Sequence, residues 1–114
     1  MSINDLPFPI TDALSRRFYG NVTFYKEMVL LFIRTGQENL EKIRTSVSQG
    51  DWETVQHLAH SLKGGASNVG AVDISSLADQ LERLSMQSQP NGYDRLVGDL
   101  QRAFHSYEQI SHKL

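Results

Sequence analysis

Residues Ala59 to Ala71 read Ala-His-Ser-Leu-Lys-Gly-Gly-Ala-Ser-Asn-Val-Gly-Ala, and this stretch decides how the rest of the chain is interpreted. Apolar residues recur at spacings of three and four from Val55 to Val69, which predicts an amphipathic helix with one buried stripe. At roughly 100° per residue, His60 lies about 150° from the centre of that stripe. The pattern therefore predicts a histidine that points into solvent from the middle of a helix.

Two adjacent glycines, Gly64 and Gly65, follow His60 closely. Each glycine inside a helix costs roughly 1 kcal/mol relative to alanine, so the pair costs about 2 kcal/mol. One interpretation is that the helix ends here and that His60 is an ordinary surface residue. The other is that the helix continues and that Gly64, one turn beyond His60 on the same face, leaves a bare surface that a bulky group can approach.

Periodic apolar residues predict four more helices along the chain. Capping residues, glycines and a polar turn indicate where these helices begin and end. The expected signals are, in chain order, a cap at Thr11, a helix end at Gly20 and Asn21, a long helix from about Val22 to Gln49 with a stop at Gly50, caps at Asp51 and Asp73, and a polar turn from Gln87 to Gly92 before the last helix.

Each expected helix has one apolar face, and no segment predicts a strand. Helices with short connections imply an all-α fold, an antiparallel four-helix bundle with a short extra N-terminal helix. We expect residues 1–9 to form an N-terminal linker and residues 10–114 to form the bundle domain, with a bend at Gly36. Besides the stripe from Val55 to Val69, the residues expected to face the core are Ala13, Leu14, Phe18, Tyr25, Met28, Leu31, Phe32, Leu40, Ile43, Val47, Trp52, Ile74, Leu77, Leu81, Leu84, Tyr93, Leu96, Val97, Leu100, Phe104, Tyr107 and Ile110.

Length and composition limit the classes of function that are possible. A chain of 114 residues fits one domain, and a net charge of -2 gives no general attraction to nucleic acid or anionic lipid. Without cysteine there is no disulfide, thiolate metal site or cysteine nucleophile. The longest apolar run, Met28 to Ile33, is too short to span a bilayer. We therefore expect a soluble, cytoplasmic monomer that neither binds nucleic acid nor inserts into a membrane.

The stretch from Ala59 to Ala71 follows the pattern Ala-His-x-Leu-Lys-Gly-x-Ala-x-x-Val-Gly-Ala, which resembles the signature of histidine-containing phosphotransfer (HPt) domains. The resemblance extends to Phe18-Tyr19-Gly20-Asn21, with the apolar residues after it, and to Leu77-x-x-x-Leu81-Glu82. It covers most of the chain, although only the first stretch is specific to the family. It implies a phosphorelay intermediate, which accepts a phosphoryl group on histidine from a phospho-aspartyl receiver domain and passes it to another receiver domain.

The resemblance implies roles for individual residues. His60 is the expected phosphoacceptor, and Glu82 is expected to accept a hydrogen bond from its Nδ1, so that Nε2 faces outward. Lys63, about one turn from His60, is expected to neutralise phosphoryl oxygens, with a hydrogen bond from Ser67 in support. The alternative for Lys63 and Glu82 is an ordinary solvated charge, with Glu82 and Asp79 sharing an outer face. Gly64 is expected to give the partner access, and the expected docking surface includes Gln56, His57, Ser61 and Gly65.

The chain has no Walker-type loop and no run of kinase motifs, so we expect it neither to bind ATP nor to phosphorylate itself. We therefore expect a non-enzymatic carrier without cofactor or metal of its own. The resemblance implies response-regulator receiver domains and a hybrid sensor histidine kinase as partners, and it places the phosphorylated aspartate and its Mg2+ in the receiver. The direction of phosphoryl flow stays open, as does whether the chain is free-standing or part of a larger protein.

Two other classes of function fit parts of the pattern. Glu53, His57 and His60 fall on one helical face at i, i+4 and i+7, a spacing that with Glu82 suits zinc or iron in a metal-dependent enzyme. Metal sites in helical bundles face inward, however, whereas these residues face outward. The other class is a bundle that only binds, either as an adaptor or as a phosphotransfer-like domain that occupies a receiver without transferring anything. The complete motif around His60 favours transfer.

Overall fold

Five helices make up most of the part of the chain that the computed structural model describes, which is residues 8–88 and 91–114. They are α1 (Phe8–Phe18), α2 (Val22–Ser48), α3 (Trp52–Val69), α4 (Val72–Met86) and α5 (Tyr93–Ser111). No strand occurs in these described residues, so the prediction of an all-α fold is confirmed. None of the helices in this part of the chain is long and apolar enough to cross a membrane.

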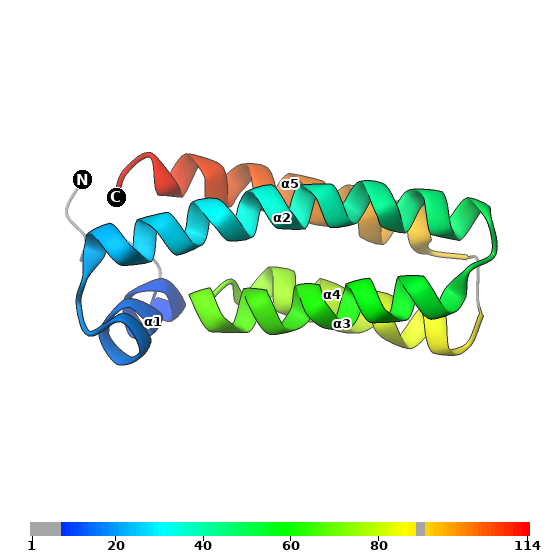
Figure 1. Ribbon diagram of the computed structural model, residues 1–114, viewed down its shortest axis with the longest axis horizontal. Coiled ribbons are helices and arrows are strands. Elements are labelled where there is room, and N and C mark those ends of the chain that lie inside the picture. Colours follow the sequence, from blue (N-terminus) through cyan, green and yellow to red (C-terminus); the bar gives the residue numbers. More distant parts are fainter. Residues whose placement is uncertain (1–7, 89–90) are drawn as a thin grey trace.

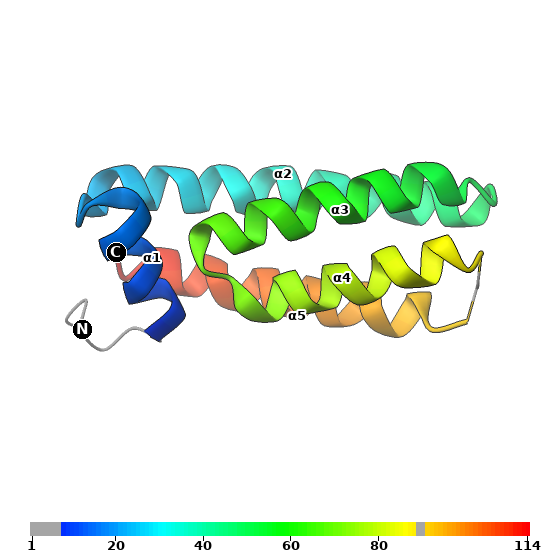
Figure 2. The same ribbon diagram turned by 90° about the horizontal axis from the view of Figure 1, so that it is seen from below.

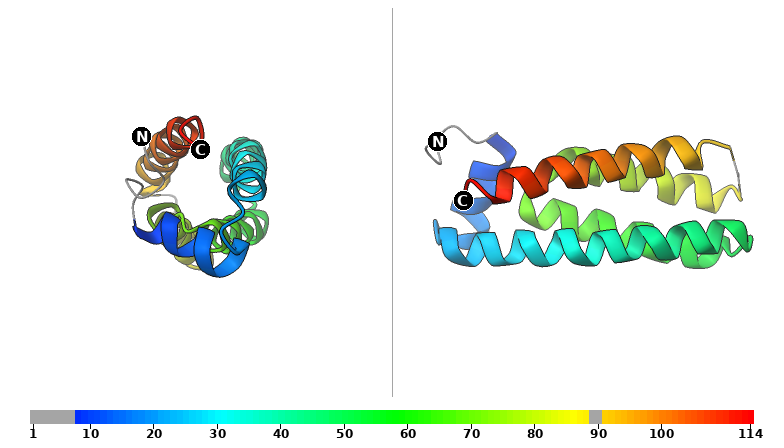
Figure 3. Two further views of the ribbon diagram at one scale, coloured as in Figure 1. Left: turned by 90° about the vertical axis from the view of Figure 1, so that its left-hand side faces the viewer. Right: turned by 90° about the horizontal axis from the view of Figure 1, so that it is seen from above.

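The four long helices, α2 to α5, lie side by side along the long axis of the molecule, which extends 44 Å (Figure 1). From α2 to α5, successive helices run in opposite directions (Figure 2). Seen from one end they surround a common centre, and α1 lies across that end (Figure 3). The short N-terminal helix expected from the sequence is therefore α1, which covers the end where α3 leads into α4.

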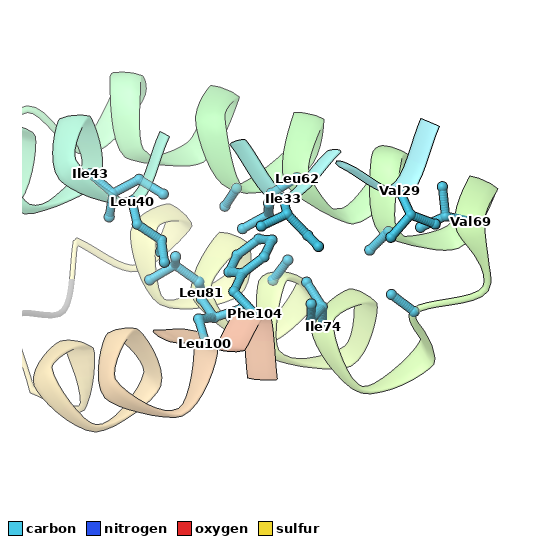
Figure 4. Close-up of a cluster of buried hydrophobic side chains, with 14 of the residues drawn as sticks. Val29, Ile33, Leu40, Ile43, Leu62, Val69, Ile74, Leu81, Leu100 and Phe104 are labelled. Carbon is cyan, nitrogen blue, oxygen red and sulfur yellow. The ribbon is translucent and has the colours of Figure 1, made fainter. Parts of the chain in front are cut away.

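A cluster of buried apolar side chains fills the centre of the bundle (Figure 4). Phe104 of α5 is fully buried, and the centroid of its ring lies 5.3 Å from that of Phe32 on α2. A Cβ atom at Gly36 of α2 would overlap the same Phe104 ring. Because α2 continues as one helix through Gly36, the role that the structure shows for this glycine is to admit an aromatic ring.

The buried face of α2 differs from the predicted one. Val29 and Ile33 are buried, whereas Leu31 is 44% exposed and Met28 is half-buried. Every residue from 28 to 33 is apolar, so periodicity alone does not locate the inner face of this segment. The prediction therefore assigned the inner face to the wrong residues of this apolar run. The other predicted core residues that are only partly buried are Phe32, Val47, Trp52, Leu58, Leu77, Leu84, Tyr107 and Ile110.

The predicted start of α1 is wrong. The helix begins at Phe8 and not after Thr11, which places Pro9 in its first turn. Proline is tolerated there, because the backbone N–H groups of the first turn have no partner within the helix. The last two residues of the predicted linker, 1–9, therefore belong to α1, and residues 1–7 lie outside the described residues.

The predicted cap of α4 is also wrong. The helix begins at Val72, and Asp73 lies within its first turn. The Asp73 carboxylate accepts hydrogen bonds from the backbone N–H of Ile74 at 2.9 Å and from the Tyr107 hydroxyl of α5 at 2.8 Å. Asp73 thus ties α4 to α5. The boundaries that agree with the structure are the cap at Asp51 and the helix ends near Gly20 and Gly50, while residues 89 and 90 of the predicted polar turn lie outside the described residues.

We predict that Gly36→Ala destabilises the bundle even though alanine favours helices. The added methyl group overlaps the Phe104 ring, and overpacking typically costs about 1–3 kcal/mol, against roughly 1 kcal/mol gained in helix propensity. Urea unfolding followed by circular dichroism measures the difference. Gly64→Ala is the matched control, because a Cβ there meets nothing within 4 Å, and it should raise stability. A Gly36→Ala chain more stable than the parent would contradict this packing.

Candidate functional site

The helix that carries His60 continues through residues 64–65 and ends at Val69. Gly70 caps it with a φ of +79°, a left-handed conformation that favours glycine. The hydroxyl of Tyr25 on α2 donates a hydrogen bond to the Val69 carbonyl at 2.6 Å, and burial raises the pKa of Tyr25 to about 12, so this hydroxyl stays a donor at neutral pH. The interpretation of the paired glycines as a helix end is therefore wrong.

The two glycines have different surroundings. Gly64 is exposed, and a Cβ atom there would meet nothing within 4 Å. A Cβ atom on Gly65 would lie 3.1 Å from Cδ1 of Phe32, which is tighter than ordinary van der Waals contact. Gly64 therefore leaves the surface beside His60 bare, whereas Gly65 lets an aromatic ring of α2 approach α3.

His60 projects from α3 with 69% of its side chain exposed, as the periodicity predicted. Its Nδ1 lies 2.9 Å from Oε2 of Glu82 on α4. Because an ionised carboxylate only accepts hydrogen bonds, this contact favours the neutral ring with its proton on Nδ1. The ring lone pair is then on Nε2, which makes Nε2 the nucleophilic atom of the side chain.

Glu82 contacts a lysine as well as the histidine. Its side chain is only 13% exposed, and its Oε1 accepts a hydrogen bond from Nζ of Lys63 at 2.9 Å. The hydrogen bond from Lys63 is the largest influence that lowers the pKa of Glu82, burial opposes it, and the contact with His60 lowers the pKa further. Glu82 is therefore ionised at neutral pH and presents one oxygen to each partner.

Lys63 is held by two carboxylates of α4. Its Nζ lies 3.1 Å from Oδ1 of Asp79, in addition to the contact with Glu82. Hydrogen bonds to Glu82 and then to Asp79 raise the pKa of Lys63 above its usual value. The other carboxylate oxygen of Asp79 lies 3.0 Å from the guanidinium of Arg83. Lys63 is thus an ion-paired residue in this structure and not a free solvated cation.

Three side-chain pairs between α3 and α4 follow one register. Each pair is symmetric in sequence about Ala71, which is fully buried in the turn between the two helices. The length of this turn therefore determines which residue of α4 faces His60. The three pairs are His60 with Glu82, Lys63 with Asp79, and Ser67 with Ser75, whose hydroxyls lie 2.9 Å apart.

The other predicted site residues lie on α3 before and after His60. Ser67 comes two turns after His60, a rise of about 10 Å along the helix. His57 and Glu53 form an exposed pair in the part of α3 before His60, with 3.9 Å between Nε2 of His57 and Oε1 of Glu53. In residues 8–88 and 91–114 no group of three or more His, Cys, Asp or Glu side chains is arranged to hold a metal ion. The remaining predicted docking residues are Gln56, which is half-buried, and Ser61, which is exposed.

Sequence reasoning missed two features of this site. Asp79 was grouped with Glu82 only as a solvated neighbour, although their spacing of three places both on one face of α4. An apolar groove of about 220 Å³ also runs between α2 and α3 beside the bare surface, with Leu31, Phe32 and Gly65 among the residues that line it. The sequence signal for the groove was the apolar run of α2, which contains more apolar residues than one buried helix face requires.

Comparison with known proteins identifies the family. The family model described as Hpt domain matches residues 27–108, and the chain therefore belongs to the Hpt domain family. Proteins of this family are phosphotransfer carriers that act with receiver domains and histidine kinases in two-component relays.

A solved structure shares the fold. The crystal structure of histidine-containing phosphotransfer protein B (HptB) from Pseudomonas aeruginosa PAO1 aligns with this chain at a TM-score of 0.78. The alignment covers 99% of each chain at 23% sequence identity. No match was found among curated proteins.

We predict that NMR of the 15N-labelled protein shows the neutral ring of His60 protonated on Nδ1. Long-range 1H–15N correlation above about pH 8, where histidines are neutral, distinguishes the two ring nitrogens. Glu82→Ala removes the acceptor, so the proton should shift towards Nε2 in that variant. Glu53→Ala, which removes the carboxylate beside His57, is the matched control and should leave the His60 signals unchanged. A parent ring protonated mainly on Nε2 would rule out the hydrogen bond seen here.

Proposed function

We propose that this chain is a phosphorelay intermediate in which Nε2 of His60 accepts a phosphoryl group from the phospho-aspartate of one receiver domain and passes it to the aspartate of another. The observation that carries this proposal is the 2.9 Å contact of Nδ1 with Glu82 on a side chain that is 69% exposed. It leaves the nucleophilic nitrogen on an open surface. Membership in the Hpt domain family supports the same class of reaction.

In the accepting step, the lone pair of Nε2 attacks phosphorus. An N–P bond forms, the P–O bond to the receiver's aspartate breaks, and the aspartate leaves as a carboxylate. No proton has to move, because Nδ1 of His60 keeps its hydrogen. The ring becomes positively charged beside ionised Glu82, which stabilises it. The donating step is the reverse, with the aspartate of the second receiver as nucleophile.

The receiver supplies the aspartate and the Mg2+ in this proposal. Phosphoryl transfer depends on positioning and on neutralising charge at the phosphoryl oxygens, and a docked receiver provides both at the reacting atoms. This chain then contributes one oriented nitrogen, and its nearby cation, Lys63, affects the stability of the phosphorylated form. It acts as a carrier and not as an enzyme, and it needs no cofactor of its own.

We assign receiver docking to the outer face of α3 and to the groove between α2 and α3. Gly64 leaves room for a partner loop beside His60. Leu31, which is exposed at the groove, supplies apolar surface of the kind that protein interfaces bury. Ser67 lies two helical turns after His60, too far to be the preferred contact of the phosphoryl group. We therefore place it in the docking surface. The other residues assigned to this surface are Gln56, His57, Ser61 and Gly65.

We further propose that the segment from α1 to α5 forms one domain, an antiparallel four-helix bundle. We propose that this domain works as a monomer in the cytoplasm. The alternating directions of the long helices in Figure 1 support the antiparallel arrangement. A monomer keeps the face around His60 free for receivers. The proposed partners are receiver domains of response regulators and of a hybrid sensor histidine kinase, with no role for nucleic acid or membrane insertion.

We predict that incubation with 32P-labelled phospho-receivers transfers label to this chain through an acid-labile, base-stable bond. His60→Gln should abolish the labelling, because it removes the accepting nitrogen. His105→Gln is the matched control, since it removes an exposed histidine of α5 that lies outside the proposed docking surface, and it should be labelled like the parent. Equal labelling of the His60→Gln chain, or no labelling by any member of a broad receiver panel, would overturn the proposed function.

We predict that Gly64→Gln slows transfer by at least about tenfold, because its side chain occupies the surface that a partner must approach. The same variant should be up to about 1 kcal/mol more stable than the parent, since it replaces a helical glycine. Gly64→Ala shares the gain in stability with far less bulk and should transfer faster than Gly64→Gln. Stopped-flow transfer and urea unfolding separate the two effects. Unchanged transfer in Gly64→Gln would show that this surface is not used.

A further inference from the structure

Asp79 is linked to the site without contacting His60. It lies one helical turn before Glu82 on α4, and both carboxylates bind Nζ of Lys63, at 3.1 Å and 2.9 Å. Asp79 and Lys63 are 31% and 32% exposed, so their ion pair is partly sheltered from solvent. The contact with Glu82 keeps that carboxylate ionised. The second contact, with Asp79, adds another anion that holds the ammonium group at α4, one turn away from the carboxylate that contacts His60.

A phosphoryl group would change the charge balance at this site. In the structure two carboxylates, Glu82 and Asp79, pair with two cations, Lys63 and Arg83, beside the His60 ring. A phosphoryl group on Nε2 brings a charge of roughly −2 at neutral pH. The ring keeps its Nδ1 proton and becomes positive, so Glu82 gains a second cationic partner. Glu82 then attracts Lys63 less strongly, so Asp79 becomes the main anion that competes with the phosphoryl oxygens for Lys63.

Resting on the proposed function of His60, we propose that Asp79 is a positioning residue that competes with the phosphoryl group for Lys63 and so shortens the lifetime of the phosphohistidine. Loss of the phosphoryl group proceeds through a loose, metaphosphate-like transition state, in which the phosphoryl oxygens carry less charge than in the dianion. A cation on those oxygens therefore stabilises the ground state more than the transition state. By holding Lys63 away from the phosphoryl oxygens, Asp79 keeps the N–P bond easier to break.

The expected effect is modest, because a partly exposed ion pair is weak and is readily exchanged. Asp79→Asn keeps the size and shape of the side chain and removes its charge, so Lys63 is freed to contact the phosphoryl group. The lifetime of the phosphohistidine should then lengthen about twofold to fivefold. Lys63→Gln should shorten it, and the double variant should resemble Lys63→Gln, because Asp79 acts only through Lys63.

The experiment uses phosphoramidate as a small-molecule phosphoryl donor, so no receiver is needed. Its P–N bond breaks, ammonia leaves, and an N–P bond forms at Nε2 of His60. Hydrolysis then transfers the phosphoryl group to water as inorganic phosphate, and 31P NMR follows the decay of the phosphohistidine signal. Asp99→Asn is the matched control, because Asp99 is likewise paired with an arginine of its own helix, Arg102, but lies on α5. It should leave the lifetime unchanged.

A second readout tests the contact in the unphosphorylated protein. Asp79→Asn should lower the pKa of the Lys63 amine, measured by NMR on 13C-methylated lysines, because one of the two carboxylates that raise it loses its charge. An unchanged lifetime in Asp79→Asn, or an equal lengthening in the Lys63→Gln background, would overturn the inference. A longer lifetime in Asp79→Asn together with no labelling by any receiver would instead overturn only the proposed exchange with receivers.

Discussion

The short turn between α3 and α4 is the constraint on which the site depends. Gly70 adopts a φ of +79°, and a side chain there would overlap the backbone of Pro9 in α1. Tyr25 of α2 holds the last carbonyl of α3, and Tyr107 of α5 holds Asp73 in the first turn of α4. The three helices outside the α3–α4 hairpin thus all secure its turn, which explains how two helices keep a fixed register near a largely exposed histidine.

The register between α3 and α4 determines which side chains surround the His60 ring. Because the pairs across the hairpin are symmetric about Ala71, His60 meets Glu82 and Lys63 meets Asp79. A one-residue insertion in the turn would rotate α4 by about 100° relative to α3 and move the carboxylate away from the ring. Glu82 divides its two oxygens between the imidazole and the ammonium, so ring orientation and local charge depend on one nearly buried side chain.

Much of this arrangement could be predicted from the sequence. Helical periodicity placed His60 outside and Val55, Ala59 and Leu62 inside, and the structure confirms both. The role of Gly65 could not be predicted, because it depends on a Phe32 ring that arrives from another helix. The second partner of Lys63 was missed for the same reason, since its contact with α4 is fixed only by the tertiary register. Local periodicity also failed in the apolar run of α2, where every residue suits either face.

The most direct test of this account is the site of the N–P bond itself. In uniformly 15N-labelled protein phosphorylated by a receiver, 31P–15N coupling identifies which ring nitrogen carries phosphorus. The account predicts coupling to Nε2 of His60, with Nδ1 still protonated by virtue of Glu82. Phosphorus on Nδ1 of His60, or on His57, His105 or His112, would contradict it.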